Sequence, residues 1–284
     1  MGIPLDVLQK WSQPGKSENS KTTYQIFQDL LINKLGNNLK IFLQGSYHNS
    51  THVKENSDID IVVLNNDIII NNTLYGLTGN LPDLRQWKNI IYNRINGAQN
   101  IYLTNDHKTI KYKGNNNYVP VDIIPCGYYR GSVVGSPVGI IIYDSFNNCY
   151  FVNYPEQHYD NGTLKSNSTD GNFKKTVRMF KNARNKAVDK GYLQNIDKCP
   201  SYFLECLVFN VPDDNFTGNE KDVFYNVIKY LYTNINNLNN IKCQNKIQNL
   251  FGQTDFGTIR YNKWNISDAI ESVNAITKLW DNWS

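Results

Sequence analysis

Two aspartates with a single residue between them open an apolar run of the chain, in the segment SDIDIVVL. They are Asp58 and Asp60. Residues two apart in a strand face the same side, so both carboxylates should project from one face of a buried strand. Two like charges resist burial unless a positive group holds them, and Lys54 is the only basic residue close by in the sequence. Carboxylate oxygens are typical ligands of Mg²⁺ or Mn²⁺, so the pair predicts a divalent-metal site.

A third carboxylate, Asp122, lies in a second apolar segment, VPVDIIPC. Two carboxylates from one strand and one from a neighbouring strand can bind two metal ions roughly 4 Å apart, the arrangement used for in-line phosphoryl transfer. We therefore expect Asp58, Asp60 and Asp122 to be catalytic and to hold two Mg²⁺ or Mn²⁺ ions. The alternative is structural, because an aspartate at the start of a strand can cap a turn and an Asp-x-Asp pair often occurs by chance.

The residues Gln44, Gly45 and Ser46 form a short QGS motif about a dozen residues before the carboxylate pair. A glycine in a turn lets the backbone approach a triphosphate closely, and backbone amides and a serine hydroxyl can donate hydrogen bonds to phosphate oxygens. The spacing of QGS, SDIDIVV and PVDIIP favours a nucleotide-phosphate site over a chance cluster of carboxylates.

The composition restricts the class of protein. The chain has 284 residues and a formal net charge of +4, which suits an anionic ligand in one cleft better than an extended nucleic-acid footprint. The sequence has no long apolar run, no signal-peptide pattern and no CxxC pair, so we expect no membrane span and a cytoplasmic protein with reduced thiols. The histidines show no metal-ligand spacing, and we interpret each as an exposed polar side chain. They are His48, His52, His107 and His158.

The hydrophobic patterns divide the chain into two halves, with a boundary near 155–170. The first half has helical periodicity over 5–36, strand patterns near 41–44, 57–64, 100–104, 108–113 and 118–124, a helix within 75–96 and a hairpin over 139–151. The second half has helical patterns alone, over 172–191, 201–211, 220–238 and 266–283. This order predicts an α/β half followed by an all-helical half.

The three motifs together resemble those of the DNA polymerase β-like nucleotidyltransferase superfamily. Within it the chain is similar to the bacterial cGAS/DncV-like nucleotidyltransferases, which make cyclic oligonucleotide second messengers in anti-phage (CBASS-type) defence. The similarity extends to the segments NYPEQHYDNGTLKSNSTDGNFKKTVRMFKNAR and PSYFLECLVFNVP, and it covers roughly residues 40–212. The group often called clade E is the most similar part of that family.

The resemblance implies an α+β fold. A polymerase β-like nucleotidyltransferase core, a mixed sheet with flanking helices, would pack on a C-terminal helical domain. We expect the catalytic core with its N-terminal helices at 1–160. The helical domain, at 161–284, would form the other wall of the active-site cleft.

The resemblance also implies roles for single residues. Asp58, Asp60 and Asp122 match the metal-binding triad, while Gly45 and Ser46, preceded by Gln44, match the turn that holds the donor triphosphate.

Further positions match ligands of the donor nucleotide. Lys181 and Ser201 match positions that contact phosphates, and Tyr202 matches an aromatic residue that stacks on the donor base. Arg178 lies three residues before Lys181 on one helix face, so both could meet the same triphosphate. The alternatives are a solvated helix face for the two basic residues and ordinary core packing for Tyr202.

The implied substrates are nucleoside triphosphates, UTP and ATP, with CTP or GTP as further candidates. The implied product is a cyclic dinucleotide, and a downstream effector would bind this product rather than the chain itself. A linear nucleotidyltransferase, extending an RNA end or nucleotidylating another acceptor, would use the same carboxylates. A non-catalytic nucleotide-binding module would tend to lose a metal ligand, whereas this sequence keeps all three aspartates.

We further expect uridine in the product, because clade E includes members that use pyrimidines. An asparagine amide can donate to a uracil carbonyl and accept from its N3–H, and the Asn-rich segment 153–172 should lie by the cleft. The alternative is that these residues reflect the asparagine-rich composition of the whole chain. They are Asn153, Asn161, Asn167 and Asn172.

Overall fold

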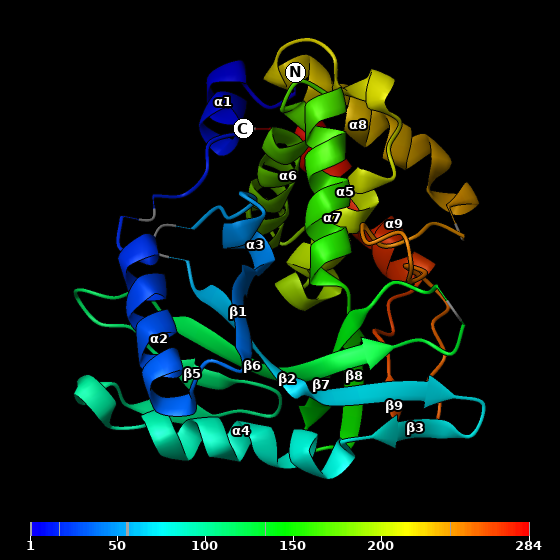
Figure 1. The fold of residues 1–284 in the computed structure, drawn as a ribbon. Helices are drawn as coiled ribbons and strands as arrows, with labels where there is room; N and C mark the ends of the chain where they lie inside the picture. Colours follow the sequence, from blue (N-terminus) through cyan, green and yellow to red (C-terminus); the bar gives the residue numbers. More distant parts are fainter. Residues whose placement is uncertain (1, 17, 55–56, 134, 239, 284) are drawn as a thin grey trace.

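The computed structural model describes residues 2–16, 18–54, 57–133, 135–238 and 240–283. In this part of the chain the strands form one mixed sheet. Helices α2 and α4 lie against one side of the sheet, and the helices after residue 155 gather on the other side (Figure 1). The predicted α+β fold is thus confirmed.

The strands of the sheet follow the order β1-β2-β6-β7-β8-β9, with β3 paired to β2 and the β4–β5 hairpin paired to β6. Strands β1 and β2 are antiparallel, whereas β2 and β6 are parallel. The bounds are β1 (Leu39–Gln44), β2 (Ile59–Thr73), β3 (Gly76–Gly79), β4 (Leu103–Asn105), β5 (Ile110–Tyr112), β6 (Val121–Arg130), β7 (Gly139–Asp144), β8 (Cys149–Asn153) and β9 (Ile259–Arg260).

The helices fall before, between and after the strands. They are α1 (Leu5–Trp11), α2 (Ser20–Leu35), α3 (Gly45–His48), α4 (Leu81–Ile95), α5 (Pro155–Ser168), α6 (Asn172–Asp189), α7 (Ser201–Phe209), α8 (Glu220–Asn234) and α9 (Ile266–Asp281). Short 3-10 turns are η1 (Ala98–Asn100), η2 (Ile196–Lys198), η3 (Asp213–Phe216) and η4 (Ile235–Asn237). None of the helices in the described ranges is both long enough and apolar enough to cross a membrane.

Most predicted elements are present, with shifted ends. The helical pattern over 5–36 is two helices, because Pro14 and Gly15 interrupt it, and α2 ends where Gly36 adopts a φ of 90°. Strand β2 continues to Thr73, well beyond the predicted end at residue 64. The sequence does not predict helix α5, which is polar and lacks a clear period, or strands β3 and β9, which have only 4 and 2 residues.

The alternating directions of the side chains along β2 determine on which face of the sheet the candidate catalytic residue Asp60 lies. Ile59, Ile61 and Val63 belong to the core that packs on α2 and α4, while Val62 and Leu64 belong to a small cluster on the opposite face. Asp60 and Val62 are two residues apart in the strand, so their side chains project from the same face, which is turned toward the helical half. The period-two prediction for this strand is confirmed.

The helical half has its own core, built from α6, α7, α8 and α9. Helix α1 joins this core through Leu8, and Trp11 packs edge-on against Trp283 with the ring centres 5.5 Å apart. Conversely, Ile259 of β9, from the C-terminal part of the chain, is buried in the core of the sheet. Each half thus contains a segment from the other end of the chain, and the division at residue 160 stays a prediction.

Candidate active site

The strand registers align a row of polar side chains across the sheet. Gln44 at the end of β1 pairs with Asp60 of β2, and Asp60 pairs with Asp122 of β6. Residues that pair directly across strands project from the same face. Asp58 precedes β2 by one residue, so the three predicted carboxylates approach one another at the starts of two parallel strands.

These carboxylates interact electrostatically. Burial, which is the largest cause, and the charges of Asp58 and Asp122 together raise the pKa of Asp60 to about 7. Burial also raises the pKa of Asp122, an increase that Lys111 opposes and Asp58 reinforces. Lys111 pairs with Asp122 across β5 and β6, although its amino group bonds to Asp106 at 2.8 Å. Negative charge at this site is therefore only partly compensated by the protein.

The QGS motif packs directly on the carboxylate row. Helix α3 begins immediately after β1, and Gly45 adopts a φ of +74°. A Cβ atom at this position would lie 2.0 Å from Oδ2 of Asp60. Glycine is required for both reasons, and the turn brings Ser46 next to the carboxylates.

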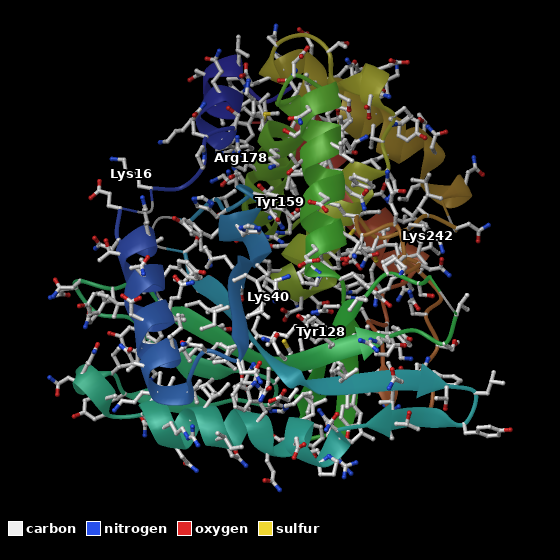
Figure 2. All side chains as sticks on the ribbon, in the orientation of Figure 1. Lys16, Lys40, Tyr128, Tyr159, Arg178 and Lys242 are labelled. Atoms are coloured by element: carbon white, nitrogen blue, oxygen red, sulfur yellow. The ribbon has the colours of Figure 1, made fainter. Side chains whose placement is uncertain are left out.

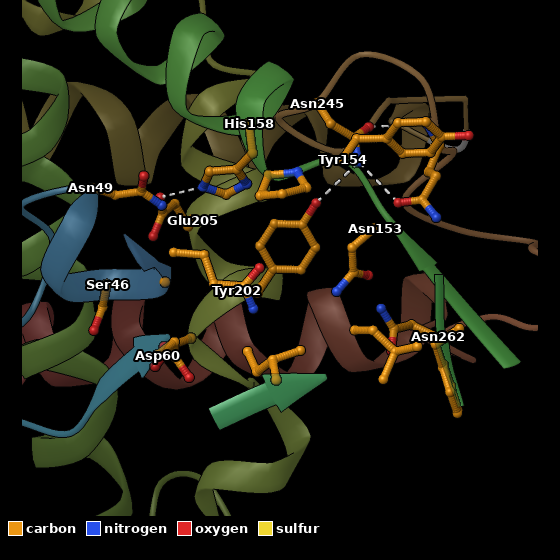
Figure 3. Close-up of a pocket in the computed structure, with 18 of the residues that line it drawn as sticks. Ser46, Asn49, Asp60, Asn153, Tyr154, His158, Tyr202, Glu205, Asn245 and Asn262 are labelled. Atoms are coloured by element: carbon orange, nitrogen blue, oxygen red, sulfur yellow. Dashed lines mark hydrogen bonds and ion pairs between the residues drawn. The ribbon is translucent and has the colours of Figure 1, made fainter. Parts of the chain in front are cut away.

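A pocket of about 540 Å³ opens above this face of the sheet. Its floor includes Ile124, Ile142 and Phe151, and Figure 3 shows Ser46, Asp60 and Tyr202 around it. The predicted site residues that line this pocket are Gln44, Gly45, Ser46, Asp58, Asp60, Lys181, Ser201 and Tyr202.

Two predicted residues lie outside the lining of this pocket. Asp122 lines an adjoining cavity of about 440 Å³, which shares Lys108, Thr109 and Phe151 with the main pocket. Arg178 lines neither of the two cavities. The sheet thus brings Asp122 beside Asp60, but their side chains border different spaces.

Arg178 and Lys181 of α6 donate to carbonyls in the segments that follow α1 and α3. Figure 2 labels Arg178 among the side chains of the chain. This residue donates to the carbonyls of Ser12 and Ser50. Lys181 is 2% exposed and donates, at 3.1 Å each, to the Thr51 carbonyl, the Thr51 hydroxyl and Oε2 of Glu205. An ammonium group has three donors, and all three have partners here. These contacts do not support the expectation that both residues meet one triphosphate.

Glu205 joins several parts of the pocket wall. Besides Lys181, it accepts from the Thr51 hydroxyl at 3.0 Å and lies 3.1 Å from Nε2 of His158 (Figure 3). Burial alone would raise the pKa of Glu205, but Lys181 and His158 hold it at about 2. The interpretation of His158 as an exposed side chain is wrong, since the residue is buried in this network. His52 is also buried, against the carbonyl of Gly15.

Tyr202 presents a ring to the pocket from the first turn of α7. The ring packs against His158, with centres 5.1 Å apart, and against Trp264, with centres 5.7 Å apart. Its hydroxyl accepts from Asn245 at 3.4 Å (Figure 3). The preceding Ser201 is exposed, and its hydroxyl accepts from Arg184 at 3.3 Å.

The segment before α9 contributes a wall of the pocket that the sequence does not predict. Gln248 donates to the carbonyl of Val152 at 3.0 Å and so ties this segment to β8. Its polar sequence has no period or motif that would have indicated a role. The lining residues from this segment are Asn245, Gln248, Arg260, Tyr261, Asn262 and Trp264.

The asparagine-rich segment lies mostly away from the pocket. Asn153, at the end of β8, lines it. Asn161 and Asn167 lie on α5 outside the lining, and Asn172 donates to the carbonyl of Phe216 at 2.9 Å. The segment therefore borders the cleft only at its start, through Asn153, Tyr154, Pro155 and His158, and Asn153 is the one of the four asparagines that lines the pocket.

The carboxylates suit a divalent metal by their chemistry. They are hard oxygen donors with too little positive charge nearby, and the pKa values of Asp60 and Asp122 are raised, so a bound cation would relieve the repulsion between the carboxylates. Within the described ranges, no three His, Cys, Asp or Glu side chains converge into a ready-made metal site. Binding of one ion by all three carboxylates would therefore require their side chains to move closer together.

Family models match both halves of the chain. Residues 25–138 match a nucleotidyltransferase domain, and residues 160–281 match the cGAS/DncV-like nucleotidyltransferase C-terminal helical domain. Enzymes of the polymerase β-like nucleotidyltransferase class generally use divalent metal ions.

Relatives match nearly the whole chain. A cyclic UMP-AMP synthase of Rhodothermus marinus is 32% identical, covering 100% of this chain and 99% of its own. A cyclic dipurine nucleotide synthase of Elizabethkingia meningoseptica is 33% identical over 84% of this chain and 87% of its own. The structure of the Rhodothermus marinus CdnE c-UMP-AMP synthase with Apcpp and Upnpp has a TM-score of 0.85 at 31% identity, covering 99% of this chain and 98% of that one. The chain therefore belongs to the cGAS/DncV-like nucleotidyltransferases, among the CdnE-type cyclic dinucleotide synthases.

Proposed function

We propose that this chain joins two nucleoside triphosphates into a cyclic dinucleotide at the starts of β2 and β6. The observation that carries the proposal is the register of Asp60 with Asp122, next to the turn at Gly45. That arrangement sets carboxylates beside a turn whose backbone and Ser46 hydroxyl can hold a triphosphate. Two Mg²⁺ or Mn²⁺ ions on Asp58, Asp60 and Asp122 would stabilise charge on the phosphates and acidify the attacking hydroxyl.

The chemistry is an in-line displacement performed twice. The hydroxyl of the acceptor nucleotide attacks the α-phosphorus of the donor, and the bond from that phosphorus to pyrophosphate breaks. Asp122, with its raised pKa, accepts the hydroxyl proton. The linear dinucleotide then turns so that its free hydroxyl attacks its own remaining triphosphate, and a second pyrophosphate leaves.

The walls of the pocket would bind the two nucleotides. Tyr202 offers a ring face to the donor base, and Ser201 is exposed toward the phosphates. Lys181 acts indirectly, since it holds Thr51, whose N–H donates to the Ser46 carbonyl at 2.9 Å. The buried charges of Lys181 and Glu205 thereby keep the phosphate-binding turn in place.

Overall sequence identity to the relatives does not indicate which bases the product contains. The UMP-AMP relative and the dipurine relative are 32% and 33% identical to this chain. A few hydrogen bonds in the pocket decide such preferences. We propose that the product contains uridine and that the Asn153 amide contributes to its recognition, because Asn153 lines the pocket at the end of β8.

Pairwise omission of nucleotides tests both parts of the proposal. The enzyme is incubated with Mg²⁺ or Mn²⁺ and either all four nucleoside triphosphates or ATP and GTP alone, then treated with phosphatase and analysed by mass spectrometry. We expect a phosphatase-resistant cyclic dinucleotide that contains uridine and is lost when UTP and CTP are omitted. Undiminished cyclic purine product would overturn the uridine claim alone, whereas phosphatase-sensitive linear products would favour the linear transferase.

A further inference from the structure

Lys108 lies on the loop between β4 and β5 and borders both cavities. Its amino group lies 3.9 Å from the centre of the Phe151 ring, in the floor of the main pocket. Across the residues that the structure describes, Lys108 forms no hydrogen bond and no ion pair. An aromatic face holds this ammonium group in place without neutralising it.

The other long cationic side chains of the pocket already have partners. Lys181 bonds to Glu205 and Thr51. Arg260 donates to the carbonyl of Gly257 at 2.7 Å, and its Nε lies 3.6 Å from Asp255. Of the lysine and arginine side chains that line this pocket in the described ranges, Lys108 is therefore the one whose charge is free for a ligand.

Lys108 and the Gly45 turn flank the carboxylates from opposite sides. Strand β1, which leads into Gly45, pairs with β2 on the side away from β6. Strand β5, which follows Lys108, pairs with β6 on the side away from β2, with Ile110 opposite Ile123. The carboxylate strands thus separate two anion-binding elements, a glycine turn and an unpaired lysine.

We propose that Lys108 binds the 5′-triphosphate of the acceptor nucleotide, an inference that rests on the proposed function. Formation of the first phosphodiester consumes the donor triphosphate and leaves the acceptor triphosphate intact. Two triphosphates therefore occupy the site at once, because the acceptor ribose that presents its hydroxyl to the carboxylates also carries a triphosphate, and this second anion needs its own cation. Lys108 supplies three hydrogen-bond donors on the side that the Gly45 turn does not reach.

The test measures how strongly the enzyme prefers an acceptor that carries a triphosphate. The donor is a 2′,3′-dideoxynucleoside triphosphate labelled at the α-phosphate, which has no acceptor hydroxyl. The acceptors are the four ribonucleotides, supplied either as triphosphates or as monophosphates. The variants are Lys108→Met and, as a matched control, Lys113→Met, which removes the same charge from a nearby exposed position outside both cavities.

We expect the wild type and Lys113→Met to transfer label to triphosphate acceptors roughly tenfold faster than to monophosphates, in line with a charge-assisted contact. In Lys108→Met the preference should fall to about threefold or less, with an unchanged melting temperature. The inference would be overturned if Lys108→Met kept the wild-type preference for triphosphate acceptors, or if the wild type showed no such preference. Failure of the wild type to form any labelled dinucleotide would instead overturn the proposed function.

Discussion

Gly45 and Asp60 are in contact across the β1–β2 corner. A Cβ atom on residue 45 would lie 2.0 Å from Oδ2 of Asp60, and the backbone there has a φ of +74°. This contact couples the position of the turn proposed to bind phosphate to that of Asp60, a carboxylate proposed to be catalytic. The glycine of the QGS motif is therefore required because a side chain there would clash with Asp60, in addition to its proposed role in triphosphate binding.

The first prediction separates this contact from ordinary backbone strain. Gly45→Ala should reduce synthesis by more than tenfold, because the methyl group displaces Asp60 from the row. Gly36→Ala is the control, since its φ is +90° but no atom lies within 4 Å of the added methyl group. Gly36→Ala should lose about 1 kcal/mol of unfolding free energy through its positive φ alone, and Gly45→Ala should lose at least as much. Equal activity of the two variants would show that the contact is unimportant.

A second prediction concerns pH. The folded pKa of Asp60 is about 7, against an ordinary value of 3.8, so between these values the folded chain binds more protons than the unfolded chain. Stability of the metal-free protein therefore falls as the pH rises through this window. Asp60→Asn removes the effect, and its melting temperature should exceed that of the wild type by a few degrees at about pH 8 but not at about pH 4.

Asp214→Asn provides the control for that experiment, since Asp214 is exposed on η3. Its melting temperature should follow that of the wild type at each pH. A constant difference between Asp60→Asn and the wild type across the range would contradict the raised pKa of Asp60.

The Lys181–Glu205 pair gives a third prediction. Lys181→Met leaves Glu205 buried with only the His158 ring and the Thr51 hydroxyl as side-chain partners, and such a loss costs about 3–5 kcal/mol of unfolding free energy. Lys175→Met, on the same helix, removes a loose pair with Glu220 at 3.9 Å and should cost less than about 1 kcal/mol. Urea unfolding of both variants measures the difference. Equal midpoints would mean that the pair does not hold the wall together.

The fourth prediction distinguishes base stacking from core packing at Tyr202. Tyr202→Ala should weaken nucleotide binding by about 1–3 kcal/mol, whereas Tyr202→Phe keeps the ring and should be mild. Calorimetric titration gives the affinities, and thermal melting of the same variants gives their stability. A large loss of melting temperature in Tyr202→Ala without a selective loss of affinity would assign the ring to the contacts with His158 and Trp264.

Local patterns were sufficient to predict the centre of the site. The alternation in β2 fixes the side on which Asp60 projects, and two apolar strands that each carry an aspartate are expected to be neighbours. The helical spacing also predicted that Arg178 and Lys181, three residues apart, lie on the same face of one helix. Spacing could not show that this face turns toward the carbonyls of Ser50 and Thr51.

The far wall of the pocket depends on contacts between distant segments. Glu205 bonds to Thr51, which is 154 residues away in the sequence, and to His158 on α5. A glutamate within the apolar run SYFLECLVF was a signal of a buried charge, but the sequence could not name its partners. The segment ending at Trp264 is polar and aperiodic, so its place beside Tyr202 follows from tertiary packing alone.

The most direct test of the account is product formation by the double variant Asp58→Asn, Asp60→Asn. Wild type and variant are incubated with the four nucleoside triphosphates and Mg²⁺ or Mn²⁺, and the phosphatase-resistant product is quantified by mass spectrometry. The wild type should yield a cyclic dinucleotide. The variant should yield none while melting at the same or a higher temperature without metal, because the charge repulsion on β2 is gone. Near-wild-type synthesis by the folded double variant would contradict the assignment of catalysis to these carboxylates.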